Sequence, residues 1–133
     1  MSGERVVVVD DDDGFRHLVV ASLRSQGFNI VGSADSAASG RDVVARERPD
    51  IVVHDVRLPD MDGFDSVPLL REAAPDVLVV LMSGSHPADL ESRRRRERVT
   101  VIDKAHPPMT WGSLLRDLLV EFQRNPSGAP AEE

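Results

Sequence analysis

Five short runs rich in β-branched residues recur at regular intervals along the chain. They occupy residues 6–9, 28–31, 51–53, 77–82 and 99–102. Each run is nearly continuous in Val, Ile and Leu, which is typical of strands buried on both faces of a parallel sheet. Parallel strands need crossover connections, which are usually helices. The pattern therefore favours an α/β fold.

Helical patterns lie between these runs. We expect helices at about residues 13–26, from 35 or 36 to 48, at 64–74 and at 88–98, and a last one near the C-terminus. Gly27, Pro49 and Pro75 stand where the first three helices should end. The fourth helix is poor in apolar residues. The last carries a stripe at helical spacing that comprises Trp111, Leu114, Leu115, Leu118, Leu119 and Phe122. Five strands alternating with five helices predict a doubly wound parallel sheet with right-handed crossovers.

Length and composition indicate one domain and exclude several functions. The 133 residues contain no cysteine, which excludes disulfides and thiolate metal sites. No apolar run approaches the length of a membrane span and the first residues do not form a signal peptide, so we expect a cytoplasmic protein without a membrane contact. The net charge of −7 argues against direct nucleic-acid binding. We expect one domain over residues 1–124, followed by a tail or the start of a linker over 125–133.

Polar side chains follow four of the predicted strands. These groups are Asp10 to Asp13, His54 and Asp55, Ser83 and Gly84, and Asp103 and Lys104. In an open parallel sheet, ligands bind beyond the carboxyl ends of the strands. Neighbouring carboxylates repel each other unless a cation lies between them, and hard oxygen ligands suit Mg²⁺. The sequence therefore predicts a magnesium site at this edge of the sheet.

The same groups suit phosphoryl transfer. A metal-bound carboxylate such as Asp55 can accept a phosphoryl group and form an aspartyl phosphate. Mg²⁺ and Lys104, the sole lysine among 16 basic residues, would balance the charge on the phosphoryl oxygens. Ser83 would donate a hydrogen bond, and Gly84 would leave room for the group.

Four motifs in this order resemble those of the response-regulator receiver domain, the phosphoacceptor module of two-component signalling. They are VVVVDD at residues 6–11, PDIVVHDVRLPDMDG at 49–63, VVLMSG at 79–84 and VIDK at 101–104. The resemblance covers about residues 5–122. It implies a flavodoxin-like sheet with strand order 2-1-3-4-5, and a phosphoacceptor rather than an enzyme that turns over a separate substrate.

The resemblance also implies a role for each site residue. Asp55 would accept a phosphoryl group from a histidine kinase or a phosphotransfer protein. Mg²⁺ would be held by Asp10, Asp11, Asp55 and the backbone carbonyl of Arg57. Lys104 would pair with the phosphoryl oxygens and Ser83 would move to bond them, while the side chains of Arg57 and Ser85 would tune hydrolysis. In the acidic run, Asp12 and Asp13 would lie outside the metal's ligands, with Asp13 as a helix N-cap.

In such receivers phosphorylation repacks the face formed by the fourth helix, fifth strand and fifth helix, through which a homodimer can form. If a DNA-binding domain follows residue 125 in the complete protein, this chain is the regulatory half of a transcriptional regulator. Three departures fall on this face. Ala105 replaces the usual cis proline, so we expect a trans bond there. Val101 replaces the switch aromatic, and the fourth helix has little apolar surface.

Two other features need an interpretation. His54 replaces an aliphatic residue before the phosphoacceptor, and strand alternation points it away from Asp55, so we expect a neutral, hydrogen-bonded core histidine. The arginine run from Arg93 to Arg96 spans more than one helical turn, which favours a solvated helix over a basic patch for an acidic partner.

Two alternative functions stay open at this point. A receiver-like module can signal by protein contact without phosphorylation, although no acid, acceptor or lysine is missing here. A phosphatase of the haloacid dehalogenase type uses a similar aspartyl phosphate, and the DDDG at residues 11–14 resembles its nucleophile motif. That class needs a further acidic metal-binding motif after the lysine strand, where only Asp117 and Glu121 occur before the tail.

Overall fold

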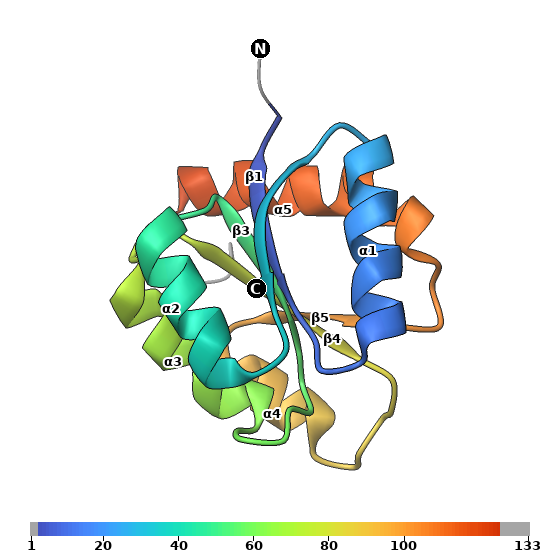
Figure 1. The fold of residues 1–133 in the computed structure, drawn as a ribbon. Helices are drawn as coiled ribbons and strands as arrows, with labels where there is room; N and C mark the ends of the chain where they lie inside the picture. Colours follow the sequence, from blue (N-terminus) through green and yellow to red (C-terminus); the bar gives the residue numbers. More distant parts are fainter. Residues whose placement is uncertain (1–2, 126–133) are drawn as a thin grey trace.

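The computed structural model describes residues 3–125, and within them five parallel strands form one sheet in the order β2-β1-β3-β4-β5. Helices cover both faces of this sheet (Figure 1). The elements are β1 (Arg5–Val9), α1 (Asp13–Ser25), β2 (Asn29–Ala34), α2 (Ala37–Glu47), β3 (Ile51–Asp55), α3 (Gly63–Ala73), β4 (Leu78–Ser83), α4 (Leu90–Glu97), β5 (Thr100–Asp103), the 3₁₀ turn η1 (Pro108–Thr110) and α5 (Gly112–Arg124). The predicted fold class and flavodoxin-like strand order are confirmed.

The register of the sheet brings the carboxyl ends of four strands to one edge. In the pairing of β1 with β3, Val9 lies opposite His54, and in the pairing of β4 with β5, Ser83 lies opposite Asp103. The residue after each of these strands therefore emerges beside the ends of its neighbours. Parallel pairing alone is enough to gather the polar groups that the sequence scatters over about 95 positions.

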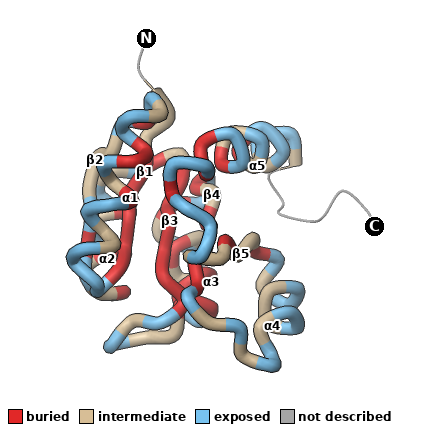
Figure 2. Tube along the Cα trace, turned by 90° about the vertical axis from the view of Figure 1, so that its right-hand side faces the viewer, coloured by how far each residue is buried: buried red, intermediate tan, exposed pale blue. Residues whose placement is uncertain are grey.

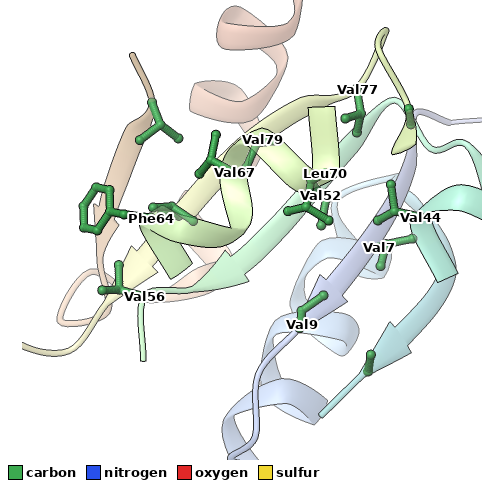
Figure 3. Packing of buried hydrophobic residues seen from close by; sticks show 14 residues of the cluster. Val7, Val9, Val44, Val52, Val56, Phe64, Val67, Leu70, Val77 and Val79 are labelled. Atoms are coloured by element: carbon green, nitrogen blue, oxygen red, sulfur yellow. The ribbon is translucent and has the colours of Figure 1, made fainter. Parts of the chain in front are cut away.

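Alternate residues of the strands fill two apolar cores. The core on the α2 and α3 side contains Val7, Val9, Val52, Val44, Val67 and Leu70, several of which are labelled in Figure 3. The core on the α1 and α5 side contains Val6, Val8, Val53, Val19, Leu23, Leu115 and Leu119. Burying each such side chain stabilises the fold by about 1.5–3 kcal/mol. In Figure 2 the buried segments follow the central strands, whereas α4 carries none.

Most predicted element bounds agree with the structure to within about two residues, although β2 continues to Ala34. Gly27 has a φ of 96° and ends α1 as expected. The prediction that Asp13 caps α1 is wrong. Asp12 has the extended backbone of an N-cap, and its carboxylate accepts a hydrogen bond from the Phe15 amide, so Asp13 is already helical.

Leu114 also departs from the prediction, because its side chain is 41% exposed. The α5 stripe centres on Trp111, Leu115 and Leu119, which are buried, and Leu114 lies at the border of that stripe. The tail expected over residues 125–133 lies, apart from Asn125, outside the described residues.

Gly63 lets the start of α3 approach the end of β3 closely. A Cβ atom at this position would lie 2.5 Å from the carbonyl oxygen of Asp55 and 2.7 Å from the Cα of Val56. Both are backbone atoms, which cannot rotate away. The Gly63 amide donates a 2.6 Å hydrogen bond to the Val56 carbonyl, so the approach is also held by a hydrogen bond.

We expect Gly63→Ala to lower the free energy of unfolding by about 2 kcal/mol or more, because the methyl group forces strand and helix apart. Urea denaturation followed by circular dichroism measures the change. Gly14→Ala is the matched control, since the nearest atom to its Cβ is 3.5 Å away in the Asp12 side chain, and it should be neutral or slightly stabilising. Equal stability of the two variants would contradict this role of Gly63.

Candidate functional site

Three carboxylates meet at the carboxyl edge of the sheet. Asp10 and Asp11 follow β1, and Asp55 ends the neighbouring β3. One carboxylate oxygen from each lies within 4.8 Å of the others. Asp10 and Asp55 are buried, while Asp11 is exposed. The structure thus brings together the three acidic residues that were expected to bind metal.

Lys104 joins the buried pair of carboxylates. Its ammonium nitrogen lies 2.9 Å from Oδ2 of Asp10 and 3.2 Å from Oδ2 of Asp55. Its position depends on β5, because the Lys104 amide donates to the Ser83 carbonyl at the end of β4. The ammonium also lies 4.7 Å from the centre of the Phe15 ring, which favours the charged form.

The pKa values of Asp55 and Lys104 are both raised, but for different physical reasons. Burial, with a further contribution from the charge of Asp10, raises the pKa of Asp55 to about 6, although Lys104 and the Arg57 amide partly oppose the shift. Burial alone would lower the pKa of Lys104. The hydrogen bond that Lys104 donates to Asp10 and the charges of the two carboxylates outweigh that effect and raise the pKa, so Lys104 is a cation at neutral pH.

The donor set fits a hard divalent cation. All three clustered side chains offer carboxylate oxygens, which are the ligands that Mg²⁺ prefers. Asp11 is exposed, so water can complete the coordination shell. The backbone carbonyl of Arg57, expected as a further ligand, lies in the loop two residues after Asp55; that role stays a prediction.

Ser83 lies at the end of β4 and is buried. Its hydroxyl donates a 2.6 Å hydrogen bond to the Ser85 carbonyl and accepts one from the Ser85 amide. A Cβ at Gly84 would lie 3.7 Å from Cδ of Lys104, an ordinary contact distance. Ser83 is therefore positioned at the same edge as Lys104, with its hydroxyl held by the following loop.

His54 is a buried core histidine, as expected. Its Nδ1 lies 2.8 Å from the Asp55 carbonyl oxygen and its Nε2 lies 3.2 Å from Oγ of Ser66. A carbonyl can only accept, so Nδ1 carries the proton and Nε2 accepts from Ser66. Burial lowers the pKa of His54 despite these contacts. The imidazole is therefore neutral, and both of its nitrogens are engaged by the Asp55 carbonyl and the Ser66 hydroxyl.

Several contacts around the site had no signal in the sequence. Asp60 accepts hydrogen bonds from the Ala37 and Ala38 amides at the start of α2. These bonds anchor the loop after β3, and they lower the pKa of Asp60. The partners are more than 20 residues apart, so no local pattern links them.

The Lys104–Ala105 segment has a trans geometry, since residues 3–125 contain no cis peptide bond. The Ala105 amide donates to Oδ1 of Asp103 at 2.8 Å, a hydrogen bond that proline could not make. The other oxygen of Asp103 lies 2.9 Å from Nε2 of His86 in the loop after β4. The prediction of a trans bond at Ala105 is confirmed.

Comparison with known proteins agrees with this geometry. The family model of the response regulator receiver domain matches residues 6–105. The protein named "Probable transcriptional regulatory protein TcrX" from Mycobacterium tuberculosis is 41% identical over 79 residues, which are 59% of this chain and 33% of that protein. Sporulation initiation phosphotransferase F of Bacillus subtilis is 28% identical over 90 residues, covering 68% of this chain and 72% of that protein.

The fold has close counterparts among solved structures. A CheY-like response regulator receiver domain protein from Methanospirillum hungatei superposes with a TM-score of 0.82 at 20% identity. The superposition covers 92% of this chain and 98% of the other. The chain spans only about a third of the length of TcrX, so it corresponds to one part of that regulator. With its family match, strand order and acidic cluster, this chain belongs to the response regulator receiver domain family of two-component signalling.

Proposed function

We propose that this receiver domain is phosphorylated on Asp55 in a reaction that depends on Mg²⁺ held by Asp10, Asp11, Asp55 and the Arg57 carbonyl. The observation that carries the proposal is the contact of Lys104 with both Asp10 and Asp55. Lys104 contacts Asp55, the proposed acceptor, and Asp10, a proposed metal ligand, and both are buried. Its ammonium can stabilise negative charge on the Asp55 carboxylate and then on the phosphoryl group.

The transfer needs little covalent chemistry from the protein. A carboxylate oxygen of Asp55 forms the new bond to phosphorus, and the bond from phosphorus to the donor breaks, with the electron pair leaving on the donor. The donor is a phosphohistidine of a histidine kinase or phosphotransfer protein. Lys104 stabilises the negative charge on the phosphoryl oxygens. Mg²⁺ would supply further neutralisation of that charge.

Ser83 provides the link to signalling. To donate to a phosphoryl oxygen, its hydroxyl must give up the bond to the Ser85 carbonyl, which changes the loop before α4. We propose that this change reaches the face of α4, β5 and α5 and that a homodimer can form there. Position 101 in β5 is a half-buried valine. Because valine is not aromatic, no aromatic side chain reports the change at that position.

The output of the whole protein follows from its relatives by analogy. TcrX is named a transcriptional regulator, and a DNA-binding output domain beside this receiver is our proposal for the complete protein. We also propose a cytoplasmic location, in line with a phosphohistidine donor. Within residues 3–125, no helix is long and apolar enough to cross a membrane.

Acetyl phosphate with Mg²⁺ should add one phosphoryl group to the wild type, read as a shift in intact mass. Asp55→Asn replaces the nucleophilic carboxylate by a neutral amide, so we expect labelling to be lost. Asp13→Asn is the matched control, because Asp13 belongs to the same acidic run but lies outside the cluster, and it should be labelled normally. A well-folded wild type that takes no label would contradict the proposal.

Asp55→Asn should also stabilise the metal-free protein. A pKa raised to about 6 means that the folded state disfavours the ionised form of Asp55. The resulting loss of stability is absent below about pH 4, where Asp55 is protonated in both states, and is fully present above about pH 6. We expect the variant to gain about 1–3 kcal/mol in the free energy of unfolding at pH 7.5 and almost nothing at pH 4. Urea titrations at the two pH values measure this. An equal gain at both would show that ionisation is not the cause.

Binding of Mg²⁺ should weaken in mild acid, because a proton on Asp55 competes with the metal. With a pKa of about 6, we expect the dissociation constant to rise about 10-fold between pH 7.5 and pH 5. Isothermal titration calorimetry at several pH values gives the profile. In Asp55→Asn any remaining affinity should vary much less over this range. A flat wild-type profile would exclude Asp55 as the titrating ligand.

A further inference from the structure

Polar contacts, with little apolar packing, attach α4 to the rest of the domain. No residue of α4 is buried, and its one apolar residue, Leu90, is half-buried against the core. At the C-terminal end of the helix, the Arg71 side chain on α3 donates to the carbonyls of Glu97 and Arg98 at 2.8 and 2.9 Å. A second side-chain contact between α4 and α3 is made by Arg93.

Arg93 reaches from α4 to the start of α3. Its Nη2 lies 2.8 Å from Oδ1 of Asp62, and its guanidinium carbon lies 4.6 Å from the centre of the Phe64 ring. The same Asp62 oxygen caps α3 by accepting from the Phe64 amide at 2.8 Å. The Arg93 side chain is only 23% exposed, so this pair is better shielded from water than an ordinary surface ion pair.

Asp62 is in turn joined to the loop that follows Asp55. Arg57 and Asp62 form an antiparallel backbone bridge, and the next residue, Gly63, donates to the Val56 carbonyl. The loop from Val56 to Asp62 is thereby closed at its base. A side chain that holds Asp62 in place therefore also restrains the backbone of Arg57.

We propose that Arg93 is a positioning residue for the metal site, acting through Asp62 on the Arg57 backbone, so that Mg²⁺ binding and the Arg93–Asp62 contact stabilise each other. This inference rests on the proposed function, in which the Arg57 carbonyl is a metal ligand. Coupling of this kind is reciprocal: if the Arg93–Asp62 contact favours bound metal, bound metal favours that contact by the same factor.

The other arginines of α4 do not share this geometry. Arg94 and Arg95 pair with Glu91 within the helix itself. Arg96 is exposed and makes no ion pair or side-chain hydrogen bond among the described residues. Arg96 is consequently a matched control for Arg93, because both are arginines of the same short helix and both substitutions remove one positive charge.

The test is Mg²⁺ affinity, measured by isothermal titration calorimetry for the wild type, Arg93→Ala and Arg96→Ala. Loss of a nearby positive charge by itself would strengthen cation binding. Coupling predicts the opposite sign for Arg93→Ala, a rise of about 3- to 10-fold in the dissociation constant, with little change for Arg96→Ala. Arg93→Lys keeps the charge that faces Asp62 and should recover part of the affinity.

Hydrogen exchange of the α4 amides gives a second readout. In the wild type, Mg²⁺ should slow exchange in α4, and in Arg93→Ala this response should disappear while the strands of the core keep their protection. Arg71→Ala frees the other end of α4 without touching Asp62. It should speed exchange in α4 with a much smaller effect on Mg²⁺ affinity.

The outcomes separate this inference from the proposed function. Wild type that binds Mg²⁺ while Arg93→Ala binds it equally or more tightly overturns the role of Arg93 alone. Equal weakening by Arg71→Ala and Arg93→Ala also overturns it, because the effect would then belong to α4 docking in general. A wild type that binds no Mg²⁺ overturns both proposals.

Discussion

The contact of one lysine with two buried carboxylates is the constraint on which the site depends. Asp10, Asp55 and Lys104 come from the ends of three different strands, and the ammonium group of Lys104 is shared by the two buried carboxylates. Lys104 only partly compensates the pair, so the pKa of Asp55 stays raised. The charges at the site are thus unfavourable to folding, and a further cation would reduce this effect. The burial of the two apolar cores offsets the cost.

The helices differ in how they are held, and this difference has consequences for signalling. Helices α1 and α5 cover one core and α2 and α3 the other, with buried residues on each. Helix α4 has none and depends on Arg71 and Arg93. An element with few buried contacts opens at a low free-energy cost, so α4 is the part of the domain best suited to change position. The contact of Arg93 with Asp62 joins this helix to the loop that follows Asp55.

Prediction from sequence succeeded wherever one local pattern was decisive. Runs of β-branched residues gave the strands, and glycine and proline gave the helix ends. It was wrong where neighbouring candidates compete, as for Asp12 and Asp13 at the start of α1 and for Leu114 at the border of its stripe. Such cases depend on backbone angles and on which partner a side chain meets, and a difference of one residue carries almost no signal in a single sequence.

The sequence by itself determined the element order, the two-sided burial of the strands and the residues at the carboxyl edge, because hydrophobic periodicity and turn chemistry act over short distances. Only the tertiary structure decided the contacts made by Asp60, Arg71 and Arg93. Each is a polar side chain whose partner lies more than 20 positions away in the chain. Such side chains reach several partners equally well until packing has fixed the helices, so the choice among them is made by the assembled fold.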